Sequence, residues 1–87
     1  MQEIKEAVKA YILKEFLPGQ DPAELTDATP LIEGRILDSL ATLKLVSFLE
    51  ERFGIQIEAY EADVDHFNTI ETIARLVEAK QKAMGRA

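Results

Sequence analysis

The side chain with the clearest chemical potential is the hydroxyl of Ser39, which follows Asp38 at the predicted start of an amphipathic helix. Backbone N–H groups and the positive end of the helix dipole meet at such a start and favour a phosphate anion. A phosphodiester on Ser39 would be stabilised there. The alternative is structural, because Asp and Ser are common helix caps that contribute about 0.5 to 2 kcal/mol without further function. Taken alone, the position favours the cap.

The other reactive side chains do not form a recognisable catalytic set. The chain has one histidine, His66, and no cysteine. A hydrolytic triad of Ser39, His66 and an aspartate is an alternative, although ordinary histidines greatly outnumber catalytic ones. Two carboxylate pairs are typical of solvated helix faces, namely Glu50 with Glu51 and Glu58 with Glu61. We therefore predict no catalytic residue of the chain's own. We also predict no metal site, because zinc would have to bind one histidine plus carboxylates.

Size and charge narrow the class of protein further. The 87 residues predict a single domain spanning 1–87, which should fold alone as a monomer. Ten basic and sixteen acidic residues give a net charge of −6, without a basic stripe that could follow a nucleic acid. The start of the chain lacks a signal-like pattern, and no apolar run approaches the roughly 20 residues that span a bilayer. We expect a cytoplasmic protein with no membrane insertion and no nucleic-acid partner.

Apolar residues at helical spacing predict two long helices in the first two thirds of the chain. The first spans about residues 3–17 and stops before Pro18-Gly19. Its apolar face contains Ile4, Val8, Ile12 and Phe16. The second spans residues 39–53 and stops at Gly54. Its apolar stripe is predicted to contain Leu40, Leu43, Val46, Leu49 and Phe53. Leu45 and Phe48 lie off this stripe, so the second helix should contact neighbours on two sides.

The remaining segments predict a long loop, a short helix and a third long helix. Residues 20–37 form the loop, and its apolar residues should hold it against the core: Leu25, Leu31, Ile32, Ile36 and Leu37. A short helix is predicted at about residues 60–66. The last helix spans about residues 69–82, with Asn68 or Thr69 as its cap. Its apolar face contains Ile70, Ile73, Ala74 and Val77. The prediction is an all-α fold.

The residues around Ser39 resemble a known family. Residues 30–46, with Asp38-Ser39-Leu40 at their centre, are similar to the phosphopantetheine attachment region of acyl carrier proteins. The resemblance continues through residues 49–55 and 67–70, so it covers essentially the whole chain in the family's order of elements. It implies a four-helix bundle of the acyl-carrier type, with three longer helices, one short helix and a long first loop.

The resemblance also implies how the site is used. A separate phosphopantetheinyl transferase would move 4'-phosphopantetheine from coenzyme A onto the Ser39 hydroxyl, with magnesium held mainly at that enzyme. The arm's terminal thiol would then carry acyl groups as thioesters between acyl-loading and acyl-processing enzymes. On this interpretation the chain is a carrier and not an enzyme.

The same resemblance assigns roles to residues near Ser39. Asp38 would help to position the transferase, and Leu40 would lie exposed beside the arm as a docking contact. Val46, Ile57 and Ala62 match positions that line the gap between the second and third helices, where an acyl chain could be sheltered. For Val46 and Ile57, ordinary core packing is the more favoured interpretation.

The second helix departs from the fatty-acid carriers, which resemble one another in a markedly acidic second helix. Here its predicted docking residues are Leu40, Lys44, Ser47, Glu50 and Glu51. Lys44 replaces an expected acid, and rim charges govern partner choice. We therefore predict a specialised lipid or secondary-metabolite pathway, such as polyketide biosynthesis, and not housekeeping fatty acid biosynthesis. The alternatives are an aminoacyl or peptidyl carrier, and an unmodified helical protein-interaction domain.

Overall fold

The computed structural model describes residues 2–83 and 85, and this part of the chain is helical with no strand. The elements in chain order are α1 (Gln2–Phe16), η1 (Pro22–Glu24), α2 (Ser39–Phe53), η2 (Ala59–Glu61), α3 (Val64–Phe67) and α4 (Ile70–Ala83). The prediction of an all-α fold with three longer helices is confirmed. The short helix expected at 60–66 is instead divided into the 3-10 turn η2 and the single α-helical turn α3.

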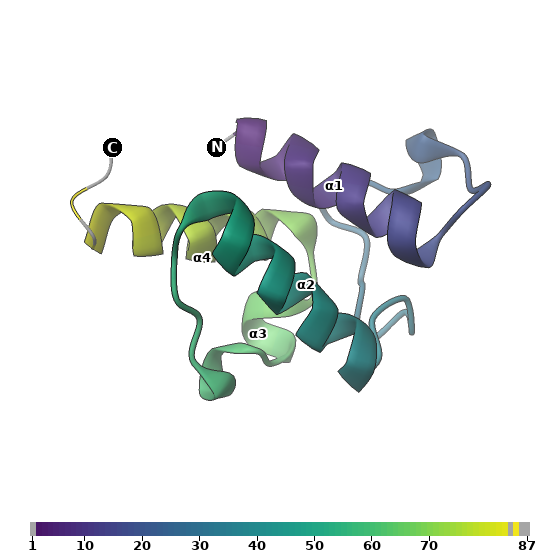
Figure 1. The fold of residues 1–87 in the computed structure, drawn as a ribbon. Coiled ribbons are helices and arrows are strands. Elements are labelled where there is room, and N and C mark those ends of the chain that lie inside the picture. Colours follow the sequence, from purple (N-terminus) through teal and green to yellow (C-terminus); the bar gives the residue numbers. More distant parts are fainter. Residues whose placement is uncertain (1, 84, 86–87) are drawn as a thin grey trace.

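Helix α4 is the element that all three other α-helices contact. In Figure 1, α1 lies along the top, α2 crosses the front, and α3 lies below α2. Helix α1 also contacts α2, which closes the core between the three long helices. The start of α1 and the end of α4 lie at the same end of the molecule, while the start of α2 lies at the other end. Ser39 is therefore remote from the first and last described residues.

The apolar faces of α1 and α4 are as predicted, but that of α2 is not. Ile4, Val8 and Ile12 are buried in α1, and the four residues predicted for α4 are all buried. In α2 the buried residues are Ala41, Thr42, Leu45 and Leu49. The predicted stripe was wrong for Leu40 and Leu43, which are 63% and 62% exposed. The helix is apolar over a wide arc, so the sequence period alone did not determine which part of the arc faces α1 and α4.

The long first loop is held to the core by apolar side chains, as predicted. Leu25, Leu31 and Leu37 are buried, and Ile32 and Ile36 pack partly against the core. Gly34 permits a tight turn in this loop, because a Cβ atom there would collide with the carbonyl oxygen of Pro30. These contacts fix the path of the loop up to the start of α2.

Asn68 fastens this loop to the segment before α4. Its side-chain oxygen accepts hydrogen bonds from the backbone N–H groups of Ile32 and Glu33, at 3.0 and 3.1 Å. Asn68 therefore does not cap α4. Of the two caps that the sequence predicted, Asn68 was wrong. The cap is Thr69, whose hydroxyl accepts a hydrogen bond from the N–H of Thr72 at 3.1 Å.

The segment after α2 begins at Gly54, which adopts the left-handed conformation with φ 65°. Its N–H donates to the Glu50 carbonyl at 2.9 Å, a common way for a helix to end. Ile55 and Ile57 then turn into the core as an extended connector. Within the described part of the chain, no helix has the length and apolar character needed to cross a membrane.

Candidate functional site

Ser39 is the first residue of α2, and Asp38 caps that helix. The Asp38 carboxylate accepts a hydrogen bond from the Ala41 N–H at 2.8 Å. The Asp38 carbonyl accepts one from the Thr42 hydroxyl, also at 2.8 Å. The carboxylate and the backbone carbonyl of Asp38 thus both accept hydrogen bonds from the first turn of α2. These bonds fix the backbone at the start of α2, and with it the direction in which the Ser39 side chain points away from the helix.

The Ser39 side chain is exposed and free to react. No other described residue forms a hydrogen bond with its hydroxyl. The backbone N–H groups of Ser39 and Leu40 also have no hydrogen-bond partner in residues 2–83 and 85. These two donors lie at the positive end of the α2 dipole, so they can donate hydrogen bonds to the oxygens of a phosphate attached to Ser39.

A cavity of about 600 Å³ opens beside Ser39. Three parts of the chain surround it: the first loop, the start of α2, and the segment from η2 to α3. Its lining residues are Ile32, Leu37, Asp38, Ser39, Thr42, Leu43, Ala59, Ala62, Asp63 and Val64. Most of these side chains are apolar. The cavity can therefore shelter an apolar group that is attached to Ser39.

The three predicted lining residues do not all reach this cavity. Ala62 lines it. Ile57 is buried in the core, and Val46 packs partly against the core, so neither is among the lining residues. Thr42, Leu43, Ala59 and Val64 occupy the walls instead. The sequence period of α2 placed Leu43 on the apolar stripe that should face the core. Its position at the cavity was therefore not predicted.

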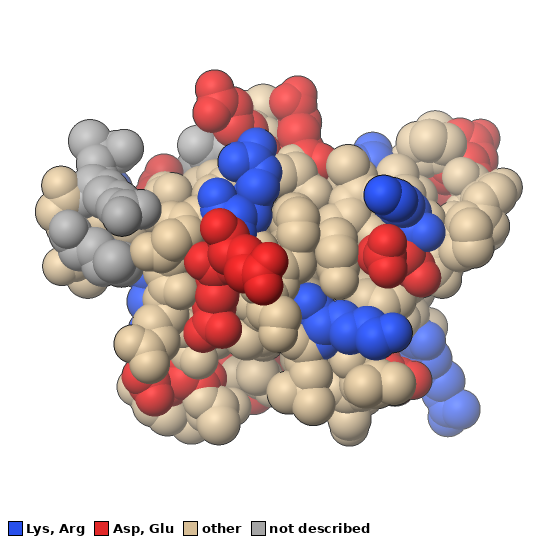
Figure 2. Space-filling view, in the orientation of Figure 1, with Lys and Arg blue, Asp and Glu red and all other residues tan. Residues whose placement is uncertain are grey.

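The predicted docking residues of α2 differ in their surroundings. Leu40, Lys44, Ser47 and Glu51 are exposed along the helix. Glu50 is half-buried, and its carboxylate accepts a hydrogen bond from the Ile57 N–H at 2.9 Å. It therefore holds the connector in place. Figure 2, which views this face of the molecule, shows acidic and basic side chains interspersed across the surface.

Lys44 also borders an aromatic contact between α1 and α2. The Tyr11 ring stacks on Phe48 with 4.1 Å between ring centroids. The Tyr11 hydroxyl donates to the Lys44 carbonyl at 3.3 Å. Burial raises the pKa of Tyr11 above its ordinary value, and the nearby Glu15 charge adds to this. These contacts fix the backbone of α2 next to Lys44.

At the α3 side of the cavity, Asp63 forms hydrogen bonds with His66. Asp63 caps α3 by accepting from the His66 N–H at 3.0 Å, and the same oxygen lies 2.7 Å from His66 Nδ1. The His66 hydrogen bond holds the pKa of Asp63 below its ordinary value. Neither residue forms a hydrogen bond with Ser39 in the described residues. The contacts of a hydrolytic triad are therefore not assembled among them.

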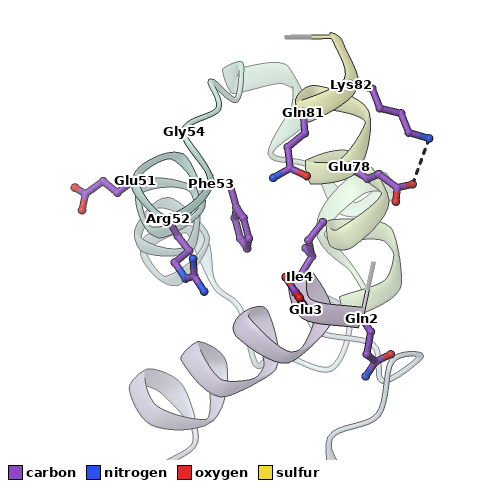
Figure 3. Close-up of a pocket in the computed structure, with 10 residues that line it drawn as sticks. All are labelled: Gln2, Glu3, Ile4, Glu51, Arg52, Phe53, Gly54, Glu78, Gln81 and Lys82. Atoms are coloured by element: carbon purple, nitrogen blue, oxygen red, sulfur yellow. Dashed lines mark ion pairs between the residues drawn. The ribbon is translucent and has the colours of Figure 1, made fainter. Parts of the chain in front are cut away.

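A larger cavity of about 840 Å³ lies at the other end of α2. Figure 3 shows Phe53 extending from the end of α2 into the space between α2 and α4. The rim carries both signs of charge, including Arg52, Glu78 and Lys82. Because α2 has 15 residues, about 1.5 Å apart along the axis, this cavity is roughly 20 Å from Ser39. It is too distant to take part in chemistry at that hydroxyl.

The geometry at Ser39 fits a phosphopantetheine group. The reactive hydroxyl is exposed, two backbone N–H groups are available for a phosphate, and an apolar cavity lies alongside. No group of three or more possible metal ligands occurs among residues 2–83 and 85. The lining residues that sequence reasoning missed include Thr42, Leu43, Ala59, Asp63 and Val64. Nothing in the local spacing indicated that the chain folds back to place them opposite one another.

Comparison with known proteins agrees with this geometry. Residues 12–77 match the family described as "Phosphopantetheine attachment site", whose members carry covalently attached 4'-phosphopantetheine. The chain is 30% identical over 79 residues to an acyl carrier protein of Thermotoga maritima (strain MSB8), covering 91% of this chain and 93% of that one. It is also similar to a chain of a solved structure titled "Crystal structure of FAD-dependent dehydrogenase". That match has a TM-score of 0.73 and 31% identity, and it covers 80% of this chain and 97% of the other. The chain belongs to the acyl carrier family of phosphopantetheine-binding proteins.

Proposed function

We propose that this chain carries acyl or related intermediates on 4'-phosphopantetheine attached to Ser39. The observation that carries the proposal is the exposed Ser39 hydroxyl at the start of α2, beside two unoccupied N–H groups and an apolar cavity. When bound, the group supplies a terminal thiol, with an ordinary pKa of about 8.5, that holds acyl groups as thioesters.

Attachment requires the Ser39 oxygen to form a bond to the phosphorus of the pantetheine phosphate in coenzyme A. The phosphoanhydride bond breaks, and the adenosine bisphosphate part leaves. We propose that the hydroxyl proton passes to a base on the transferase, because no described residue forms a hydrogen bond with the Ser39 hydroxyl. We propose that Asp38 presents Ser39 and contacts the transferase, while Leu40 supplies an apolar docking contact.

We further propose that the carried group rests in the cavity beside Ser39. Leu43, Ala62 and Val64 would contact its apolar part. Thr42 directs its hydroxyl to the Asp38 carbonyl, so that polar group is satisfied and does not oppose an apolar occupant.

The mixed charge of α2 supports a specialised pathway. Lys44 is exposed one turn from Leu40, and Glu50 is engaged with the connector, which leaves Glu51 as the remaining exposed acid of the predicted docking set. A partner built to bind a row of carboxylates would meet a like charge at Lys44 and lose a contact at Glu50. We propose partners of a lipid or secondary-metabolite pathway whose surface offers an acid to Lys44.

One partner class is suggested by the solved structure that the chain resembles. Its title names an FAD-dependent dehydrogenase, and the match spans nearly all of the similar chain. By analogy, such an enzyme would oxidise the carried group, with one hydrogen passing to the flavin as hydride and another leaving as a proton. Bleaching of the oxidised flavin on mixing with the loaded carrier would support this. No bleaching, or equal bleaching with Ser39→Ala, would count against it.

The proposed function is tested by intact mass after incubation with coenzyme A, magnesium and a broad-specificity phosphopantetheinyl transferase. The chain has only two serines, so Ser47→Ala is a matched control for Ser39→Ala. We expect one phosphopantetheine on the wild type and on Ser47→Ala, and none on Ser39→Ala. If the wild type gains no mass, the proposed function is wrong.

The aminoacyl or peptidyl carrier remains the second candidate, and it shares the same modification. Loading with fatty acyl and with aminoacyl groups by candidate partner enzymes separates the two. An unmodified interaction domain is the third candidate. It requires that Ser39→Ala leave function intact.

A further inference from the structure

One wall of the cavity beside Ser39 is fastened to the rest of the fold by an ion pair. Between Ile57 and Phe67, which are both buried, Glu61 is the single buried residue. Its carboxylate lies 2.6 Å from Lys80 Nζ, which projects from α4. The side chains of Glu61 and Lys80 are 12% and 24% exposed. Both sides of Glu61 in sequence, at Ala59 and Ala62, line the cavity.

The ion pair also shapes the backbone of this wall. The Glu61 carboxylate accepts a second hydrogen bond, from the Glu58 N–H at 2.8 Å, and this closes the turn η2. The Lys80 ammonium lowers the pKa of Glu61, and Glu61 in turn raises that of Lys80, so both groups are charged at neutral pH. One carboxylate therefore holds the turn together and ties it to α4.

A charged anchor behaves differently from an apolar one when the wall moves outward. Exposing a buried leucine costs about 1.5 to 3 kcal/mol of hydrophobic stabilisation. A separated ion pair regains its hydration, which offsets much of the lost attraction. The wall can thus swing away from α2 without exposing a large apolar side chain between Ile57 and Phe67.

We propose that the Glu61–Lys80 pair is a latch that sets which lengths of carried chain fit beside Ser39. The inference rests on the proposed function, since it assumes that the cavity holds a group attached to Ser39. With the latch closed, the wall from Ala59 to Val64 limits the cavity to about 600 Å³. With the latch open, the wall moves away from α2, and longer chains are held.

The latch is tested first without any attached group, by amide hydrogen exchange of the unmodified protein. The variants are Glu61→Gln and Lys80→Met, and the matched controls are Asp65→Asn and Lys82→Met. We expect exchange of the amides at 59–66 to accelerate about tenfold in the latch variants, with no comparable change in α1 or α2. Exchange in the latch variants equal to that in the controls would overturn the proposal.

A charge swap distinguishes loss of the ion pair from a general loss of stability in the variants. The double variant Glu61→Lys with Lys80→Glu restores an ion pair of reversed direction. It should slow the exchange of 59–66 relative to Glu61→Lys alone, since both variants lack the carboxylate that accepts from the Glu58 N–H. If the double variant exchanges as fast as Glu61→Lys alone, the pair does not act as a latch.

The cargo part is tested with short, medium and long saturated acyl groups loaded from acyl-coenzyme A. Protection of the thioester from hydroxylamine is measured for each length. We expect Lys80→Met to move the best-protected length upward, and Lys82→Met to leave it unchanged. If thioester protection depends on acyl length in the same way in Lys80→Met and in wild type, the ion pair does not select the length of the carried chain. If Ser39 accepts no group, the proposed function fails, while the exchange measurement still decides whether the latch exists.

Discussion

The Asp38 carboxylate accepts a hydrogen bond from the Ala41 N–H at 2.8 Å, and Ser39 lies between these partners in sequence. The contact is a helix cap, and it also limits how Ser39 can be presented to an enzyme. Structural and functional roles therefore coincide at Asp38. Substitutions can separate them because Asn caps a helix about as well as Asp but carries no charge.

Asp38→Ala should lower the free energy of unfolding by about 0.5 to 2 kcal/mol, because the Ala41 N–H loses its acceptor. Asp38→Asn should stay close to wild type in stability and still be modified more slowly by the transferase. Urea denaturation and the initial rate of phosphopantetheine transfer measure the two effects. Equal transfer rates for Asp38→Asn and wild type would mean that the carboxylate has no part in transferase recognition.

Asn68→Ala should destabilise the fold by about 1 to 3 kcal/mol, because two backbone N–H groups of the first loop lose their acceptor. Urea denaturation measures the loss. Thr69→Ala is a useful comparison, since it removes the cap of α4 and should cost about 1 kcal/mol without loosening the loop. Faster exchange at Ile32 and Glu33 in both variants alike would contradict the separate role of Asn68.

Gly34→Ala should destabilise the protein by about 1 to 3 kcal/mol, because the added Cβ collides with the Pro30 carbonyl oxygen and the loop must shift. Thermal unfolding measures this change. Because the loop leads into α2, the rate of transfer to Ser39 should fall as well. A variant as stable as wild type would show that the turn can rearrange freely.

Stability should fall in acid partly through Glu61 and Asp63, whose ordinary pKa values of 4.5 and 3.8 are both lowered in the fold. A lowered folded-state pKa contributes stability that is present above the ordinary value and is lost as pH falls through the folded-state value. Urea denaturation at a series of pH values below about 5 measures this loss. Glu61→Gln should flatten the profile in that window. A profile identical to that of wild type would exclude Glu61 as a contributor.

Much of the fold could be predicted from the sequence, because local signals and burial agreed. The apolar faces of α1 and α4, the stop at Gly54 and the burial of Leu31 all follow from spacing and residue type. The inward face of α2 could not be predicted in this way. Apolar residues cover most of that helix, and only its packing against α1 and α4 selects Leu45 over Leu43.

The candidate site was predictable at Ser39 but not at the cavity walls. The attachment position stands in a recognisable local sequence, whereas Thr42 and Val64 meet only because the chain folds back through η2 and α3. The contact between Glu61 and Lys80 could not be predicted either, since 19 positions separate the two residues and the sequence assigned Glu61 to a solvated helix face. Long-range contacts between polar groups leave no periodic signal.

The central claim is that Ser39 carries the phosphopantetheine group, and peptide mapping after the transferase reaction tests it most directly. Trypsin cleaves after Arg35 and Lys44, so residues 36–44 form one peptide that contains Ser39, while Ser47 lies in the next. The account predicts the added mass on the 36–44 peptide, with fragment ions that assign it to Ser39. Added mass on the peptide containing Ser47, or on neither peptide, would contradict the account.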